Sequence, residues 1–415
     1  MSESIGQPTW MTSPATRAVM DALAAKGGEG CARFVGGCVR NTLMKKPVGD
    51  IDIATTLTPD EVTQALEAAG LRAVPTGLEH GTVTAISGKK PYEITTLRRD
   101  VETDGRRAVV AFTTDWAEDA ERRDFRLNAL YADTDGAVFE PVAGGIEDAR
   151  AGRIVFVGDA EQRIREDYLR ILRFFRFHAW YGRGEPDAAA LAACARLKDG
   201  MANLAAERIA KELLKLLAAD DPRPAVRLMA ATGILRHVLP QAGSLARFEA
   251  LVAIETEQLF ENDADLRLAA LLPDRLEAAQ ETAERLRLSN AQRDRLAGAL
   301  GESPHRIVSY LSPREARQRV YALGRQAFSD RVKLAWAASG KAASQWRALL
   351  MLGQTWTAPA FPITGEEVMA AGVPKGPLVG EVLREVEAWW IDNDFIDDKL
   401  SLVERLKAVA QGLAY

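Results

Sequence analysis

The sequence predicts a mixed α/β head followed by a remainder built only of helices. Short runs rich in Val, Ile, Thr and Tyr alternate with helical segments up to about residue 155. From Asp159 onward Ala, Leu, Arg and Glu dominate, and Gly or Pro interrupts the helical pattern at intervals. At 415 residues the chain is also too long for one hydrophobic core, which favours several packing units.

The expected strands of the head are short and several are β-branched or aromatic. Two helices are expected between them, Val39–Met44 and Pro59–Ala69, and Thr58 as N-cap with Glu61 three residues later marks the start of the second. The expected strands are Ala32–Gly36, Ile51–Ala54, Gly81–Ile86, Tyr92–Leu97, Ala108–Phe112 and Ala129–Ala132.

These patterns divide the chain into four predicted parts. A head covers residues 1–155, a helical neck 156–235, a helical body 236–355 and a helical tail 356–415. A stretch punctuated by Pro and Gly, from Thr357 to Gly380, separates the last helices from the body.

Composition restricts the class of protein. The 53 basic and 58 acidic side chains give a net charge of −5, which argues against a surface coated in basic charge. No apolar run reaches the length of about 18 residues that spans a bilayer. Cys31, Cys38 and Cys194 are odd in number and lack the spacing of a metal site. We therefore expect a cytoplasmic protein with no membrane partner.

A pair of glycines followed by two aspartates forms the first functional pattern. Gly36 and Gly37 separate the first expected strand from a helix, and Arg40 lies one turn into that helix. Such a turn lets the backbone approach a phosphate closely. Asp50 and Asp52 follow and alternate with isoleucines, so the strand period of two places both carboxylates on one face.

Carboxylates about 7 Å apart along a strand, beside a phosphate-binding turn, suit Mg²⁺ that bridges a triphosphate. Glu93 on a neighbouring expected strand would add a third carboxylate, unless it is an ordinary exposed strand residue. A glycine pair alone is usually a turn, and Asp-x-Asp alone is usually solvated. Their combination in this order favours metal-dependent phosphate chemistry, with Asp50 and Asp52 as the metal ligands.

The segment Arg165–Phe177 predicts one amphipathic helix. At about 100° per residue one arc is apolar and packs. Between Arg150 and Arg183 the chain has eight arginines and four acidic residues, a local charge of +4. The arc opposite the apolar one carries Glu166, Asp167, Arg170, Arg173 and Arg176.

Asp167 and Arg170 would project side by side from this helix. An acceptor beside a guanidinium donor fits the Watson–Crick edge of cytosine or adenine, where an exocyclic amine adjoins a ring acceptor. Guanine and uracil place a carbonyl where that amine is needed. The alternative is a solvated face with an ordinary Glu166–Arg170 pair.

Together these motifs resemble the nucleotidyltransferase motif of the DNA polymerase beta superfamily and, within it, the bacterial-type (class II) tRNA nucleotidyltransferase and poly(A) polymerase family. The resemblance covers roughly residues 30–215. It implies a nucleotidyltransferase head followed by an all-α neck, body and tail. The family usually has Asp where this chain has Asn41. The matching motifs are Gly36-Gly37-x-x-Arg40, Asp50-x-Asp52 and Glu166-Asp167-x-x-Arg170.

A further motif, Glu121–Leu130, resembles the family's Arg-Arg-Asp-Phe-Thr-Ile-Asn-Ala, with Arg126 in place of the usual Thr. Arg123 can neutralise phosphate charge, while Asp124 and Asn128 offer groups suited to a ribose hydroxyl. A capped helix start with surface charges is the alternative.

Three weaker matches follow along the chain. Glu140–Ile154 is similar to a hinge-like motif, or is an ordinary loop. Glu207–Leu214 resembles an element that supports the neck, although pairing within its own helix explains most of its charges. The turn Lys375–Pro377 would face tRNA phosphates, or is a plain interhelical loop.

The resemblance implies addition of CMP and AMP from CTP and ATP to the 3′ end of tRNA without a template, with release of pyrophosphate and with Mg²⁺ as cofactor. The neck would select nucleotides and the tail would bind tRNA. The catalytic residues would be Asp50, Asp52 and Glu93, and the nucleotide would be bound by Gly37, Arg40, Arg123, Asp124, Asn128, Glu166, Asp167, Arg170, Arg173 and Arg176.

Other activities stay open at this point. Polyadenylation and the addition of only CC or only A share the same head, and the oligomeric state is undetermined. Poly(A) polymerases of this type usually have a Gly-Arg-Arg-Phe-like strand where this chain has Gly77–Val83, and they tend to be strongly basic. An inactive RNA-binding homologue would be expected to lack Asp50 or Asp52, and both are present.

Overall fold

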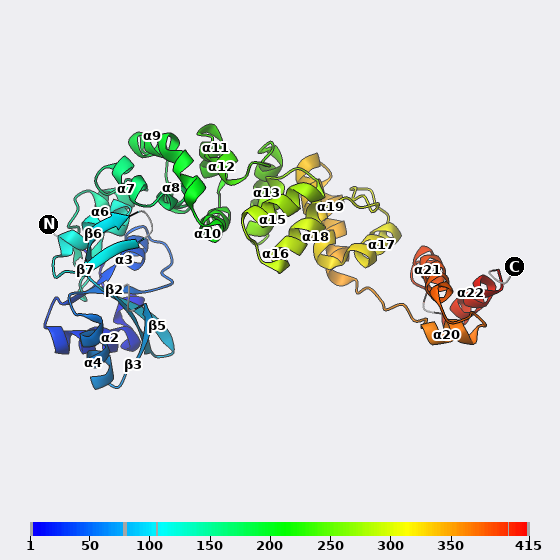
Figure 1. Cartoon of the computed structure of the whole chain (residues 1–415), viewed down its shortest axis with the longest axis horizontal. Helices are drawn as coiled ribbons and strands as arrows, with labels where there is room; N and C mark the ends of the chain where they lie inside the picture. Colours follow the sequence, from blue (N-terminus) through cyan, green and yellow to red (C-terminus); the bar gives the residue numbers. More distant parts are fainter. Residues whose placement is uncertain (1–2, 78–80, 105–106, 397, 413–415) are drawn as a thin grey trace. The chain divides into compact units, whose positions relative to one another are not determined.

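The computed structural model describes residues 3–77, 81–104, 107–396 and 398–412, which form two compact units (Figure 1). The first unit is Met1–Pro240 and the second is Gln241–Tyr415. Within the described ranges every strand lies in the first unit. The predicted α/β head followed by helices is confirmed. The finer division into neck, body and tail stays a prediction.

A mixed seven-stranded sheet is the centre of the head, with the strand order β3-β4-β5-β2-β1-β8-β9. All the predicted strands occur, with ends shifted by no more than two residues. The sheet consists of β1 (Ala32–Val35), β2 (Asp52–Thr55), β3 (Arg72–Gly77), β4 (Thr82–Ser87), β5 (Lys90–Thr96), β8 (Tyr131–Ala132) and β9 (Val138–Phe139), and a separate hairpin pairs β6 (Arg98–Asp104) with β7 (Arg107–Phe112).

Strands β3, β6 and β9 are not among those predicted from the sequence. β3 is an edge strand, where Pro75 is tolerated because an edge position needs fewer backbone donors, and its register with β4 is irregular between Val74 and Gly77. β6 is dominated by charged residues, and β9 has only two residues. Leu78, Glu79 and His80, part of the segment that favours the tRNA-type enzyme, lie outside the described residues.

Several helices of the first unit pack against the sheet. α2 (Pro14–Gly27) and α4 (Pro59–Ala68) pack on each other and on the sheet, and α3 (Gly37–Leu43) follows β1. The predicted capping box of Thr58 and Glu61 is present at the start of α4. The other helical segments are α1 (Thr9–Thr12), α5 (Trp116–Glu121), η2 (Arg126–Asn128), α6 (Gly145–Ala151), α7 (Ala160–Glu166), α8 (Leu169–Tyr181), α9 (Ala188–Leu197), η3 (Lys198–Asn203), α10 (Ala206–Leu217), α11 (Arg223–Ala231) and α12 (Ile234–Val238).

In the described part of the chain, none of the helices has the length and apolar character needed to cross a membrane. The described residues of the second unit form helices and the loops between them. The helices are α13 (Ala246–Glu257), α14 (Ala264–Ala270), α15 (Leu276–Arg285), α16 (Asn290–Leu300), α17 (Pro313–Leu323), α18 (Arg325–Ser339), α19 (Ala343–Thr355), α20 (Gly365–Ala370), α21 (Pro377–Asp392) and α22 (Lys399–Gly412).

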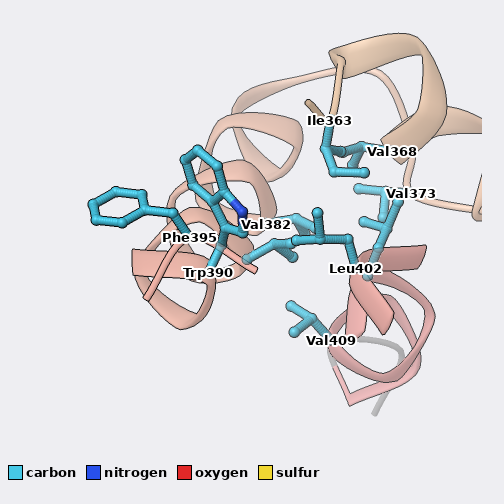
Figure 2. Packing of buried hydrophobic residues seen from close by; sticks show 10 residues of the cluster. Ile363, Val368, Val373, Val382, Trp390, Phe395, Leu402 and Val409 are labelled. Atoms are coloured by element: carbon cyan, nitrogen blue, oxygen red, sulfur yellow. The ribbon is translucent and has the colours of Figure 1, made fainter. Parts of the chain in front are cut away.

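The last three helices share a small hydrophobic core. Trp390 and Phe395 lie at one side of this core, with Val382, Leu402 and Val409 also buried in it (Figure 2). The indole N–H of Trp390 donates to the Ile396 carbonyl at 3.0 Å, which satisfies its only polar group. α21 starts at Pro377, the last residue of the predicted turn Lys375–Pro377, whose contact with tRNA stays a prediction.

Candidate active site

Strand β1 and helix α3 are joined by a sharp turn at Gly36, whose φ of 67° lies in the left-handed region that favours glycine. A Cβ at this position would lie 3.5 Å from the Asn128 carbonyl oxygen and 3.7 Å from Nη1 of Arg123. The N–H of Gly36 donates to the Leu130 carbonyl at 3.0 Å. Gly37 is the first residue of α3. The turn therefore lies against the segment that carries Arg123 and Asn128.

The predicted catalytic carboxylates lie near one another, where the start of β2 pairs with the middle of β5 (Lys90–Thr96). Asp52 is the first residue of β2, and Glu93 is its direct partner in the parallel strand β5. Asp50 precedes β2 and is exposed, whereas Asp52 is partly buried. Ile51 and Ile53, which alternate with the two aspartates, are buried, as predicted. Burial and the charge of Glu93, with a smaller effect of Asp50, raise the pKa of Asp52 to about 6, although Arg123 and Arg40 oppose the rise.

Asp50 and Asp52 carry hard oxygen ligands of the kind that a divalent cation such as Mg²⁺ prefers. Negative charge gathered at a partly buried position is stabilised by a proton or by a cation, and the raised pKa of Asp52 reports this effect. Within the described ranges no group of three or more His, Cys, Asp or Glu side chains is arranged to hold a metal ion by itself. Mg²⁺ held by Asp50 and Asp52 would take its other ligands from water and phosphate, as it commonly does.

Arg40 is buried and has protein partners on several sides. It donates to Oδ1 of Asn128 and to the hydroxyl of Tyr181, the latter at 2.8 Å, and it lies over the Tyr181 ring. Its Nε and Nη2 also donate to Oδ1 of Asn41, at 3.1 and 2.9 Å. Nδ2 of Asn41 donates in turn to the Pro47 carbonyl. Asn41 thus orients Arg40 without a negative charge, while the phosphate contact of Arg40 stays a prediction.

Asp124 lies at the centre of a buried network that joins the head to α8. Its Oδ2 accepts from Nε of Arg173 at 2.7 Å, and its Oδ1 accepts from Nδ2 of Asn128 and from the N–H of Phe125, both at 2.9 Å. Burial alone would raise the pKa of Asp124, but Arg173 and these hydrogen bonds lower it. Asp124 and Asn128 therefore bind protein partners in this structure, and their contact with a ribose stays a prediction.

A second buried network, which is not predicted from the sequence, holds Arg123. Nη2 of Arg123 lies 2.9 Å from Oδ2 of Asp119, and its Nε donates to the Tyr131 hydroxyl at 3.1 Å. That hydroxyl donates to Asp119 at 2.7 Å, and Arg122 contacts the other oxygen of Asp119. Asp119 precedes Arg123 by four residues, a spacing that could have identified it as the partner.

The predicted continuous helix over Arg165–Phe177 is wrong, because α7 ends at Glu166 and α8 starts at Leu169. Asp167 lies between the two helices with φ −153° and ψ 103°. Its Oδ1 accepts the N–H of Leu169 at 3.1 Å. The chain breaks here because a short acidic side chain can satisfy a backbone donor at a helix start, which competes with continued helix.

Arg170 contacts Glu166 rather than Asp167. It donates to Oε2 of Glu166 at 2.5 Å, to the Arg163 carbonyl at 2.8 Å and to the Arg122 carbonyl at 3.4 Å. The ordinary Glu166–Arg170 pair, which the sequence leaves as an alternative, is therefore present. Since Arg122 belongs to the head, Arg170 also connects α8 to the head. A base-reading role for Asp167 and Arg170 stays a prediction.

Helix α10 supplies two ionic partners to this region. Nη2 of Arg208 donates to Oδ2 of Asp167 at 2.7 Å, and Nε of Arg176 donates to Oε2 of Glu212 at 2.5 Å. The other Glu212 oxygen lies 4.0 Å from Arg173. The sequence interpretation of these charges as pairs within their own helix is wrong for Arg208 and Glu212. Their i, i+4 spacing allows either arrangement, so the sequence could not distinguish the two.

Comparisons with known proteins identify relatives along most of the chain. A family model described as the poly A polymerase head domain matches residues 32–155, and a model described as a probable RNA and SrmB-binding site of polymerase A matches residues 185–245. The CCA tRNA nucleotidyltransferase 1, mitochondrial, of Mus musculus is 33% identical over 397 residues, which cover 90% of this chain and 86% of the relative. The CCA-adding enzyme of Levilactobacillus brevis is 31% identical over 400 residues, which cover 93% and 96%.

Solved structures show the same fold. The Bacillus stearothermophilus CCA-adding enzyme in complex with CTP aligns with a TM-score of 0.77 at 24% identity, over 97% of this chain and 99% of that one. The Thermotoga maritima CCA-adding enzyme complexed with tRNA aligns with a TM-score of 0.66 at 20% identity, over 95% and 98%. With these likenesses in sequence and fold, the chain belongs to the family of tRNA nucleotidyltransferases and poly(A) polymerases.

Proposed function

We propose that this protein adds CMP and AMP to the 3′ end of tRNA, with CTP and ATP as substrates and pyrophosphate as product. The observation that carries the proposal is the group formed by Asp50, Asp52 and Glu93 beside the Gly36 turn. Relatives that cover about nine-tenths of the chain are named for CCA addition, which supports tRNA as the acceptor.

In this reaction the 3′ oxygen of the RNA bonds to the α-phosphorus of the nucleotide, and the bond from that phosphorus to pyrophosphate breaks. Asp50 and Asp52 would hold Mg²⁺, and Glu93 adds a third carboxylate beside them. The chemistry that bound Mg²⁺ supplies is activation of the attacking hydroxyl and neutralisation of charge on the departing pyrophosphate. Gly37, at the start of α3, would allow the phosphates to approach the backbone.

Charged residues of α8 and of the head would bind the rest of the nucleotide. Asp167 and Arg170 are proposed to read the base. Asp124 and Asn128 are proposed to bind the ribose. Five further charged residues are proposed to take part in binding the nucleotide. Because Asp124 pairs with Arg173 and Glu212 pairs with Arg176 in this structure, nucleotide binding would add to these contacts or exchange them. The five further residues are Arg40, Arg123, Glu166, Arg173 and Arg176.

The same proposal assigns roles to the predicted parts of the chain. The head (1–155) would carry catalysis, the neck (156–235) nucleotide selection, and the tail (356–415) binding of tRNA, with the body (236–355) between them. The match of residues 185–245 to a probable RNA-binding model supports RNA contact near the neck. The cytoplasmic location stays a prediction, since the mouse relative is named as mitochondrial.

The deciding experiment supplies the protein with Mg²⁺, a tRNA that lacks its 3′ CCA, and each labelled nucleotide alone and in combination. We expect two C residues and one A residue to be added, and none to be added from UTP or GTP. A suitable control pair is Asp52→Asn, which removes a metal ligand, and Asp60→Asn, which changes an exposed carboxylate on α4.

Each other result contradicts the proposal in a distinct way. Open-ended addition of A would identify a poly(A) polymerase. Addition limited to C or to A would identify a specialist of one step. Absence of transfer by a folded protein that still binds this tRNA would identify an RNA-binding homologue without activity.

A further inference from the structure

Helix α10 lies against α8 and faces it with charges that complement those of the nucleotide site. Its buried side chains, among them Leu213, Leu216 and Leu217, pack the helix in place. Arg208 and Glu212 are one turn apart on this helix and reach the residues at the α7–α8 junction and on α8. α10 thus brings an arginine to the acid of the predicted base-reading pair.

Two contacts set the orientation of the Asp167 carboxylate. Oδ1 accepts the N–H of Leu169 at 3.1 Å, and Oδ2 accepts from Nη2 of Arg208 at 2.7 Å. The side chains of Asp167 and Arg208 are 33% and 50% exposed, so the pair is open to solvent. Each carboxylate oxygen has two lone pairs, and one contact on each leaves a position for a further donor.

The other charged contacts of this region are more enclosed. The Arg170–Glu166 pair has both side chains 14% exposed, and Arg170 is also held by two backbone carbonyls. The Arg176–Glu212 pair is shielded to a similar degree. The acid of the Arg208–Asp167 contact is 33% exposed, whereas Glu212 is only 8% exposed, so Asp167 is the more accessible of the two acids to an incoming base.

We infer that Arg208 is a positioning residue for nucleotide selection, which holds the Asp167 carboxylate where the exocyclic amine of a base can donate to it. The inference rests on the proposed base-reading role of Asp167. Without Arg208 the carboxylate keeps one contact to the Leu169 N–H and can rotate about its side-chain bonds. A carboxylate that can rotate forms a weaker hydrogen bond with the exocyclic amine of cytosine and repels the carbonyl of uracil less. The preference for cytosine over uracil therefore falls.

The test measures equilibrium binding of CTP and of UTP, without RNA, to the full-length protein and its variants. Arg208→Ala should reduce the ratio of the two affinities about tenfold, which is the size expected when a charged hydrogen bond loses its orientation. Arg208→Lys should restore part of the ratio because it keeps the charge. Asp167→Ala and the double variant Asp167→Ala/Arg208→Ala should have equal ratios, since Arg208 acts through Asp167.

A matched control is Arg165→Ala, which removes an exposed arginine that pairs with Glu161 on the same surface. It should leave the affinity ratio unchanged, and all variants should unfold at temperatures near that of the wild type. The inference is overturned if Arg208→Ala keeps the wild-type ratio, if the double variant loses more than Asp167→Ala alone, or if the wild type does not prefer CTP. Because no RNA is present, a failure of the proposed tRNA extension would be seen separately, in the extension assay.

Discussion

Asp52 and Glu93 lie directly opposite each other in the parallel pair β2–β5, which places the carboxylate at the start of β2 beside a carboxylate in the middle of β5. Parallel pairing requires a crossover, and α4 with the β3–β4 hairpin provides it. Burial and the nearby charge of Glu93 disfavour the ionised carboxylate of Asp52, and its pKa is raised as a result. Negative charge concentrated in this way opposes folding and is consistent with the proposed binding of a cation.

Asp52→Asn should lower kcat for nucleotide transfer by about 10³-fold, because metal activation supplies several kcal/mol of the barrier reduction. The same change should leave the protein folded and raise its melting temperature slightly in Mg²⁺-free buffer at pH 7, since the ionised carboxylate is disfavoured in the fold. Single-turnover kinetics and thermal unfolding check both effects. A loss of less than tenfold would show that Asp52 is not a metal ligand in the reaction.

The stability of the head should depend on pH through Asp119. Burial would raise the pKa of this carboxyl, but Arg123 and Arg122 outweigh burial and lower it to about 2. A depressed pKa contributes stability above the unfolded value near 4 and loses it as pH falls toward 2. Asp119→Asn should therefore reduce the free energy of unfolding by about 2 kcal/mol at pH 7.

Urea unfolding at pH 7 and at pH 3 measures this dependence. The difference between wild type and Asp119→Asn should be smaller at pH 3, whereas the exposed Asp135→Asn should behave as wild type at both values. If the stability difference between wild type and Asp119→Asn does not change with pH, the loss comes from the packing and hydrogen bonds of the side chain and not from its charge.

The Asp124–Arg173 pair should connect the stability of the head to that of α8. Removing one partner leaves a buried or half-buried charge, so Asp124→Ala and Arg173→Ala should each cost about 2 kcal/mol. The double variant should cost less than the sum, with a coupling of about 1 kcal/mol or more. The exposed Arg165–Glu161 pair provides the comparison, and its coupling should stay below about 0.5 kcal/mol. Additive losses at Asp124 and Arg173 would contradict the linkage.

The sequence predicts the parts of this site that depend on local pattern. In Asp50–Ile53 the isoleucines are buried and the aspartates more exposed, as the period of two predicts, and Gly36 lies in a turn with positive φ, because strand alternation and turn conformation are local properties. The binding of metal and phosphate by these residues stays a prediction. The capping box at Thr58 follows from the same kind of rule.

Contacts between distant segments could not be predicted in the same way. The break at Asp167 results from competition between a side-chain cap and the continued helix, which the hydrophobic period does not register. The counterions Glu212 and Arg208 reach their partners only after α10 packs on α8. Strand β3 is not predicted because Pro75 argues against a strand. Proline is tolerated there only because β3 lies at the edge of the sheet.

Asn41→Asp tests whether the amide at this position, where the family usually has Asp, lowers the stability or the activity of the protein. A carboxylate would gain an ionic contact with Arg40, whose pKa is lowered chiefly by burial. It would lose the Nδ2 donor to Pro47 and bring an oxygen near that carbonyl. These effects oppose each other at about 1 kcal/mol each, so the free energy of unfolding should change by less than about 1 kcal/mol and kcat by less than about threefold.

Asn41→Ala removes both contacts and should destabilise the protein by about 1–2 kcal/mol in the same unfolding measurement. A gain of more than about 2 kcal/mol in Asn41→Asp would show instead that the missing charge limits how firmly Arg40 is held.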